Sequence, residues 1–588
     1  MKEYKYSAEK NVQILIDLLK KHNIRKCVCS PGATNMNFVA SMQYDGNFEL
    51  YSAVDERGAA YMATGLAFES GEPVVITCTG ATASRNYFPG LTEAFHRKLP
   101  ILAVTATQDM VNRGNLSPQF IDRSEIGSEV VKLSVDLPWV DNADDEWRAN
   151  LDVNRALLEL RRHGGGPVHI NLTTHYNNDT VDTIPEQRVI RRYTMSDAEV
   201  WPEIPAGRIA ITVGAHKIWD EKLTQVVDEF CAAYDAVVFT DHSSGYHGKY
   251  KVHATLPASQ EQYKSSIFDI DLLIHIGEHS GDYYVYDALH GKNVKNVWRV
   301  SEDGEVRDTF HKLTNVFEMS EVAFFQHYAD KAEHKDKDSY YKTCRDEIES
   351  FNAAVPELAF SNIYLAHEII PCLPENSFVH FGVSNTMRSW TFFELPETVQ
   401  SIANIGCRGI DGSLSTVLGM SQADRGKIHF AVLGDLTFFY NINALGNRHV
   451  SNNLRILLVN NGRGTEFRIY QHRAQKLLGD NADAYVAAKG HNGRKSQSLI
   501  KHFAQDLGYE YMTASNKDEL QKVMKRFLSP ELTECPMLLE VFTDSQDESD
   551  ALYAIRNIRH DAKSVGKNMV RNVLGEKGVS AMKKFMGR

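Results

Sequence analysis

The sequence predicts an α/β protein with three doubly wound parallel-sheet domains and a helical extension at the C-terminus. Short apolar segments alternate with helical segments in three successive blocks of the 588 residues. This alternation is typical of parallel sheets that are covered by helices. A chain of this length also exceeds one hydrophobic core. We expect domains at residues 1–182, 205–330 and 351–544, and a basic helical tail at 545–588.

The elements of each block are predicted from apolar runs of strand length and from the helical segments between them. The first block has strands at 26–30, 74–78, 101–106 and 167–172, with helices at 58–70 and 87–96. A polar linker at 179–205 leads to a second block, with strands at 208–213, 236–240, 270–276 and 294–300. A charged connecting helix at 330–350 precedes the third block, with strands at 428–433, 455–459 and 537–541.

Composition narrows the class of protein. Acidic side chains number 76 against 64 basic ones, and the net charge of −12 disfavours a nucleic-acid partner. The first ten residues lack a signal-peptide core, and no apolar run is long enough to cross a bilayer. The eight scattered cysteines have no zinc-type spacing and form no disulfide framework. We expect a cytoplasmic protein with small-molecule substrates.

The most specific motif joins the ends of two predicted strands. Gly434-Asp435-Leu436-Thr437 follows one strand, and Asn460-Asn461-Gly462-Arg463-Gly464 follows the next. Ligands of open parallel sheets bind at such strand ends. A carboxylate, an amide oxygen and the backbone carbonyl of Arg463 suit Mg²⁺, and a diphosphate would complete its coordination near helix N-termini. Alternatively, the first segment is a plain turn and the second a loop or helix cap.

A second motif lies far upstream. Asp55-Glu56-Arg57-Gly58 precedes a helix rich in small residues, which suits close packing in a subunit interface. Glu56 is expected in a buried setting between strand and helix. Alternatively, Glu56 only complements the dipole of the helix.

Together these motifs resemble those of thiamine-diphosphate (ThDP)-dependent enzymes of the pyruvate decarboxylase and acetolactate synthase superfamily. The loops at 30–32 and 80–84 match as well, and the resemblance extends over residues 7–544. It implies the ThDP-binding fold, with a pyrimidine domain first, a central domain second and a diphosphate domain third. It also implies ThDP and Mg²⁺ as cofactors, and a homodimer or homotetramer with active sites between subunits.

The resemblance implies roles for individual residues. Glu56 would hydrogen-bond the pyrimidine ring, Ile410 would support a bent cofactor, and Gln119 falls where related enzymes often keep an active-site glutamine. Leu436 departs from the glycine or serine-like residue that is usual in the motif. The expected cofactor-binding residues are Glu56, Gly409, Ile410, Gly434, Asp435, Leu436, Thr437, Asn461, Arg463 and Gly464, of which Asp435, Asn461 and Arg463 bind the metal; the catalytic residues are Glu56 and Gln119.

Within this family, residues 404–415 and 432–445 most resemble the menaquinone-biosynthesis synthase that joins decarboxylated 2-oxoglutarate to isochorismate. The substrate residues expected from this resemblance are Thr34, Ser384, Arg388, Arg408 and Phe467. An arginine fork at 388 would suit a substrate carboxylate, although a structural ion pair is the alternative.

Several basic residues of that synthase are replaced in this chain. The substituted positions include Ala33, Thr34 and Asn35 after the first strand, Gln108, Ile405, and the segment 278–284. Because isochorismate carries carboxylates, we expect a different acceptor, such as a neutral or sugar-derived carbonyl compound.

The expected function is decarboxylation of a 2-oxo acid, 2-oxoglutarate or pyruvate, with carboligation of the product to a second carbonyl or activated acceptor. One alternative is a simple 2-oxo acid decarboxylase. Another is an acetolactate-synthase-like enzyme, although residues 205–330 lack the glycine spacing of a dinucleotide site. A non-catalytic scaffold with the same fold is the alternative from another class.

Overall fold

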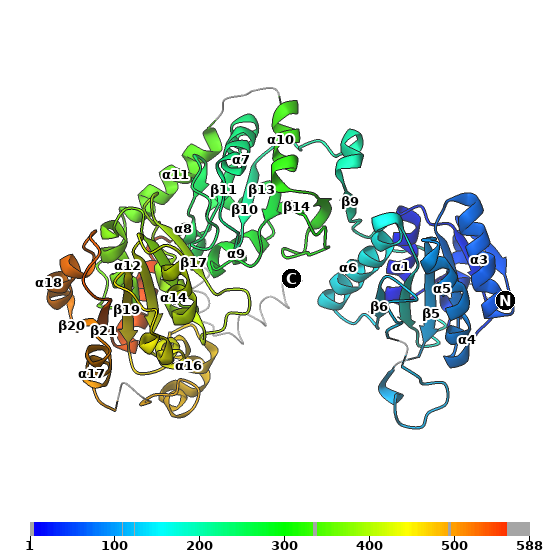
Figure 1. The fold of residues 1–588 in the computed structure, drawn as a ribbon. Coiled ribbons are helices and arrows are strands. Elements are labelled where there is room, and N and C mark those ends of the chain that lie inside the picture. Colours follow the sequence, from blue (N-terminus) through cyan, green and yellow to red (C-terminus); the bar gives the residue numbers. More distant parts are fainter. Residues whose placement is uncertain (1–4, 109, 123, 333–337, 492–494, 561–588) are drawn as a thin grey trace. The chain divides into compact units, whose positions relative to one another are not determined.

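The computed structural model describes residues 5–108, 110–122, 124–332, 338–491 and 495–560. The chain divides into two compact units, drawn as a ribbon in Figure 1. The first comprises Met1–Trp201 and Asp303–Glu318, and the second comprises Pro202–Glu302 and Met319–Arg588. No described helix is both long and apolar enough to cross a membrane.

The first unit contains a six-stranded parallel sheet in the order β3-β2-β4-β5-β7-β6. Its strands are β2 (Lys26–Cys29), β3 (Glu49–Ser52), β4 (Val74–Cys78), β5 (Ile101–Thr107), β6 (Ser134–Leu137) and β7 (Val168–Thr173). Two short pairs accompany it: β1 (Tyr6–Ser7) with β8 (Thr180–Val181), antiparallel, and β9 (Arg191–Tyr193) with β15 (Leu313–Glu318), parallel.

Helices cover both faces of this sheet. Val75 packs with α1 (Lys10–Lys21), α2 (Met36–Asp45) and α6 (Ala143–Glu159) in one core cluster. Val74 and Ile76 pack with α3 (Glu56–Ser70) and α5 (Phe88–His96) in another, beside the short α4 (Ala81–Asn86). Neighbouring residues of β4 thus face opposite sides, as the pleat of a strand requires.

The second unit contains two parallel-sheet layers. The strands of the first layer follow the order β12 (Lys251–Val252), β11 (Val237–Phe239), β10 (Ile209–Val213), β13 (Ile270–Ile276) and β14 (Val294–Ser301). Its helices are α7 (Glu221–Tyr234), α8 (Thr255–Ser259), α9 (Tyr283–His290) and α10 (Glu321–Lys331), and α7 packs against α10.

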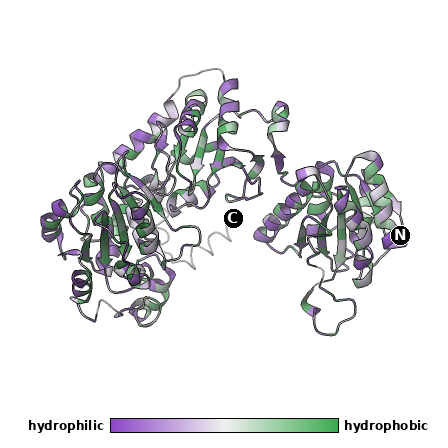
Figure 2. Cartoon of the chain, in the orientation of Figure 1, coloured by the Kyte–Doolittle hydropathy of each residue, from purple (hydrophilic) through white to green (hydrophobic). Residues whose placement is uncertain are grey.

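The other layer is a six-stranded parallel sheet. Its order is β17 (Gln400–Ala403), β16 (Phe378–Phe381), β18 (His429–Gly434), β19 (Leu454–Asn460), β21 (Met537–Phe542) and β20 (Glu510–Ala514). One face packs against α12 (Asn362–Ile369), α13 (Asn385–Trp390) and α18 (Lys517–Phe527). The other packs against α14 (Ser413–Ala423) and α17 (Leu499–Asp506). Hydrophobic colour follows the strands in Figure 2, and hydrophilic colour marks the outward sides of the helices.

The predicted fold class is confirmed, because each layer is a parallel sheet flanked by helices. The predicted strands all form, and their ends differ from the predicted ones by at most one residue. The helix expected from residue 58 begins at Glu56, since the Asp55 carboxylate accepts hydrogen bonds from the backbone N–H groups of Arg57 and Gly58. The expected linker at 179–205 contains β8 and β9. The domain boundaries stay predictions.

Two predicted helical segments are described in part. The connecting helix corresponds to α11 (Ser339–Asn352), and residues 333–337 before it lie outside the described residues. The C-terminal extension begins with α19 (Ser545–Arg556), whereas 561–588, with most of the basic residues of the predicted tail, lies outside the described residues.

Candidate functional site

Four adjacent strands of the second unit's six-stranded sheet send their C-terminal loops to one edge. β17, β16, β18 and β19 are parallel neighbours, so the segments that follow them leave the sheet on the same side. Gly434 pairs with Val459, which brings the two halves of the magnesium-type motif to adjacent strand ends. The loops also carry Ser384 after β16 and the segment 404–412 after β17. The sheet thus gathers residues that are up to about eighty positions apart.

The two side chains predicted to bind the metal are nearly enclosed. Asp435 and Asn461 are each 6% exposed. The Asp435 carboxylate accepts a hydrogen bond of 3.0 Å from the backbone N–H of Leu436. Oδ1 of Asn461 is buried and has no hydrogen-bond partner among the residues that the structure describes. An unpaired buried acceptor is costly, so this oxygen suits a cation held between the two loops.

The loop after β19 is shaped for a third oxygen ligand. Gly462 has a φ of +72°, a conformation that favours glycine. The backbone carbonyl of Arg463 accepts the N–H of Thr465 at 2.9 Å and keeps a second lone pair. The Arg463 guanidinium pairs with Asp483 at 2.8 Å, which ties the loop to the following segment. These residues therefore fit Mg²⁺ together with an anionic ligand.

The remaining residues predicted to bind the cofactor border the same edge. Thr437 is buried, whereas Gly409, Ile410 and Leu436 are half-buried. A Cβ at Gly464 would approach the Phe467 ring to 3.0 Å, so the glycine lets this loop pass close to the aromatic side chain. Phe467 also makes an edge contact with the ring of His472.

Arg388 takes part in an ion pair. Its guanidinium binds the Glu466 carboxylate, and the two side chains are 12% and 21% exposed. Arg388 and Arg408 both approach the ring of Tyr283, at 5.6 and 4.5 Å from its centroid. The structure thus brings two predicted substrate residues together and adds Glu466 and Tyr283. Sequence reasoning missed both additions, because no local pattern links them to Arg388.

Ser384 is the N-cap residue of α13 and has a φ of +67°, which is strained for a residue other than glycine. The next side chain, Asn385, donates to the Glu548 carboxylate at 3.4 Å. Glu548 comes from α19 and also accepts the backbone N–H of Asn362 and the hydroxyl of Thr543. Burial raises the pKa of Glu548 to about 7. Helix α19 therefore contacts the segment that carries Ser384.

Three predicted site residues belong to the first unit. Glu56 is half-buried and accepts a hydrogen bond from the Asn86 amide at 3.3 Å. Gln119 is exposed and has a φ of +69°. Thr34 is buried, and its hydroxyl donates to the Ala106 carbonyl at 2.8 Å. The proximity of these residues to Asp435 and Asn461 stays a prediction, as do the roles of all the site residues.

Comparisons with known proteins agree with the resemblance to ThDP-dependent enzymes. Residues 10–126 match the family described as thiamine pyrophosphate enzyme, N-terminal TPP binding domain. A 2-succinyl-5-enolpyruvyl-6-hydroxy-3-cyclohexene-1-carboxylate synthase from Phocaeicola vulgatus is 32% identical over 573 residues, covering 93% of this chain and 98% of the relative. The enzymes with this name from Bacteroides thetaiotaomicron and Porphyromonas gingivalis are 32% and 26% identical, covering 93% and 92% of this chain and 98% of each relative.

Proposed function

The chain belongs to the thiamine-diphosphate-dependent enzyme family, and from this premise we propose that it decarboxylates 2-oxoglutarate or pyruvate and joins the product to a second carbonyl compound. The chain is an enzyme of the ThDP-dependent decarboxylase and carboligase type. The observation that carries the proposal is the unpartnered, buried Oδ1 of Asn461 beside the strand end that bears Asp435. A cation-binding oxygen at this place fits the Mg²⁺ through which a diphosphate is held.

The proposed roles follow from the residues of each loop. Asp435, Asn461 and the Arg463 carbonyl hold Mg²⁺, while Gly434, Leu436, Thr437 and Gly464 surround the diphosphate. Gly409 and Ile410 support the middle of the cofactor, and Glu56 hydrogen-bonds its pyrimidine ring. ThDP, when bound, supplies a carbon nucleophile and an electron sink for the loss of carbon dioxide. The chain orients the substrates and excludes water from the reacting carbon.

We propose an acceptor without several carboxylates. The Arg388 charge is already matched by Glu466. Neutral or acidic side chains stand at the other places where the resemblance led us to expect basic ones, such as Gln108, Ile405 and Glu278. A polycarboxylate would lack compensating charge there. The relatives' name describes a carboxylate product, so we propose that this chain has kept their cofactor chemistry with a different acceptor.

We also propose a homodimer or homotetramer with the active site between subunits. Large apolar side chains are exposed on and beside α3 within the single chain. Val54 is 79% exposed and Phe68 is 61% exposed, and Tyr61 and Met62 accompany them. Such a cluster favours burial against another surface. A second copy would cover it and enclose Glu56, which is half-buried in the single chain.

The test measures carbon dioxide release from 2-oxoglutarate and pyruvate, with ThDP and Mg²⁺, in the presence and absence of candidate aldehydes. We expect release that depends on ThDP and a product whose mass equals the decarboxylated donor plus the acceptor. An aldehyde as sole product would favour a simple decarboxylase, and acetolactate from pyruvate would favour an acetolactate-synthase-like enzyme. Absence of ThDP-dependent turnover of either acid would contradict the proposal.

The variant Glu56→Gln tests the role of Glu56, because it keeps the size of the side chain and removes its charge. We expect this variant to lose turnover and largely retain ThDP binding, because the residues proposed to hold the diphosphate belong to the second unit. Unchanged turnover would refute the role of Glu56.

A further inference from the structure

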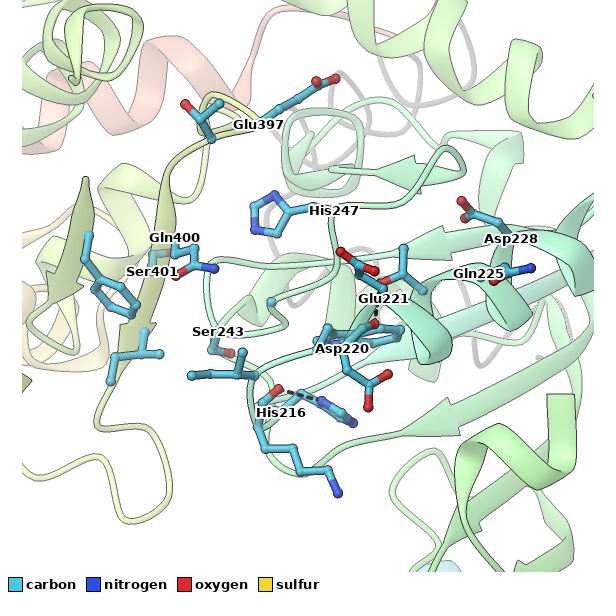
Figure 3. Close-up of a pocket in the computed structure, with 18 of the residues that line it drawn as sticks. His216, Asp220, Glu221, Gln225, Asp228, Ser243, His247, Glu397, Gln400 and Ser401 are labelled. Carbon is cyan, nitrogen blue, oxygen red and sulfur yellow. Dashed lines mark hydrogen bonds between the residues drawn. The ribbon is translucent and has the colours of Figure 1, made fainter. Parts of the chain in front are cut away.

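A cavity opens in the second unit, away from the predicted cofactor residues. Its volume is about 720 Å³, which lies within the range of small-molecule sites. It lies beyond the carboxyl ends of β10 and β11, where open parallel sheets bind ligands. Its walls come from residues 216–221, α7, residues 243–247 and a facing segment within 376–402 (Figure 3). None of the residues predicted to bind cofactor or substrate lines it.

Acidic side chains dominate the charged groups of this cavity. Its five carboxylates belong to Asp220, Glu221, Asp228, Glu229 and Glu397. Three of them are engaged: Asp220 caps α7 through the N–H of Leu223, Asp228 accepts the Tyr246 hydroxyl, and Glu229 accepts the Gln225 amide. These three therefore have structural partners.

Glu221 and Glu397 differ from the other three. Neither makes a hydrogen bond or ion pair with the described part of the chain, and both are exposed. Glu221 is the first residue of α7, whereas Glu397 precedes β17 on the facing wall. Figure 3 shows the ring of His247 between these two carboxylates. Two carboxylates on opposite walls suit a positively charged occupant.

The basic groups around the cavity do not cancel this charge. Lys217 is exposed and is the one lysine or arginine of the lining. The ring of His216 contacts Glu321 at 2.8 Å; burial lowers its pKa, but the Glu321 carboxylate and the Lys217 carbonyl together raise the pKa overall. The pKa of His247 is lowered by burial and by Lys251, against the opposite effect of Glu397 and Glu394. His247 is therefore largely uncharged at neutral pH.

Apolar side chains form the rest of the lining. Ile218, Trp219, Phe378 and Ile402 face this space. The Trp219 indole N–H donates to the Ser244 carbonyl at 2.8 Å, which anchors the ring. An aromatic face attracts a cation and also packs against an apolar body.

A bare metal ion does not fit these walls. No group of three or more His, Cys, Asp or Glu side chains within the described ranges could hold a metal ion. The volume also exceeds what one ion and its ligands occupy.

We propose that this cavity binds an organic cation, an amine or guanidinium on an apolar body, with the charge between Glu221 and Glu397 and the body against Trp219. The proposal is independent of the function proposed above, because the two sites share no residue. Binding can therefore be measured without turnover.

The test is isothermal titration calorimetry of the full chain with tryptamine and with agmatine. Indole-3-acetate serves as the anionic counterpart of tryptamine. We expect saturable binding of at least one amine at one site per chain, weakening with added salt, and no binding of indole-3-acetate. Each of Glu221→Gln and Glu397→Gln should weaken binding about two- to fivefold, and the double variant about tenfold.

The matched control is Glu349→Gln, an exposed glutamate of α11 in the same unit. Equal weakening by this control would mean diffuse attraction to an acidic protein and would overturn the proposal. Equal binding of indole-3-acetate, or no saturable binding of either amine at millimolar concentration, would overturn it as well. Because both glutamates are exposed, unchanged circular dichroism is expected to show that the variants fold.

Discussion

Replacing Glu466 with glutamine tests whether Arg388 serves the structure or the substrate. The two side chains form an ion pair and are 12% and 21% exposed. Nη1 of Arg388 and Oε2 of Glu466 are both buried without a hydrogen-bond partner in the described structure. Apart from the Glu466 carboxylate, little compensates the positive charge of the Arg388 guanidinium. Removing the carboxylate charge therefore leaves the guanidinium charged, unpaired and with little access to water.

The expected loss of stability can be worked out from how far the two side chains are buried. Breaking a fully buried pair by removing one partner costs about 3–5 kcal/mol, and an exposed pair is worth about 0–1 kcal/mol. Since both partners keep some exposure, we expect Glu466→Gln to lower the free energy of unfolding by about 2–3 kcal/mol. Arg388→Met should have a similar effect. The double variant should cost less than the sum, with a coupling of about 1–3 kcal/mol.

The assay is urea unfolding of the four proteins of this cycle, followed by fluorescence. Steady-state kinetics with 2-oxoglutarate and pyruvate accompany it. Glu466→Gln frees the guanidinium, so we expect the KM for the dicarboxylate 2-oxoglutarate to fall relative to that for pyruvate. Glu510→Gln is the control, because its pair with Arg526 is 30% and 52% exposed and should cost less than about 1 kcal/mol. Additive effects in the double variant would refute the structural ion pair.

Three further predictions concern a buried acid, a close backbone contact and the metal site. The folded Glu548 keeps its proton up to about pH 7, whereas its unfolded form, with an ordinary pKa of 4.5, has lost it. Native stability therefore falls as pH rises through this window, by up to about 3 kcal/mol, and Glu548→Gln should remove that fall in urea titrations at pH 5 and 8. Gly214→Ala should destabilise the fold by about 1–3 kcal/mol, because its Cβ would lie 2.0 Å from the Glu278 carbonyl oxygen. Asn461→Ala should weaken Mg²⁺-dependent ThDP binding about tenfold or more in calorimetry, since it removes the oxygen that we propose as a metal ligand.

Each of these predictions has a contrary result. An unchanged difference between pH 5 and pH 8 in Glu548→Gln would contradict the raised pKa. Gly419→Ala is the control for Gly214→Ala, because Gly419 lies within α14 with no atom within 4 Å of the added Cβ; equal destabilisation would exclude the contact with Glu278. If Asn461→Ala bound ThDP with an unaltered Mg²⁺ requirement, the proposed role of this side chain as a metal ligand would be contradicted.

The local pattern of the sequence was enough to predict the fold class and the edge that bears the candidate site. Asp435 and Asn461 each follow an apolar run of strand length, and parallel neighbours leave a sheet at the same edge. The start of α3 was predicted to within two residues, and the Asp55 cap accounts for the difference. The strand expected just before Glu56 forms as β3, whereas the half-exposed edge strand β20 was missed, since it is not a continuous apolar run.

Only the tertiary structure decided which distant side chains meet. Arg388 and Glu466 are 78 positions apart, and the cavity lined by Glu221 and Glu397 joins two sheet layers. Glu548 reaches Asn385 from the last described helix, and its burial there raises its pKa. Periodicity along a chain reports which face of each element is buried. Charge pairs, cavities and shifted pKa values depend instead on how those elements pack, so they become visible only when the elements are assembled.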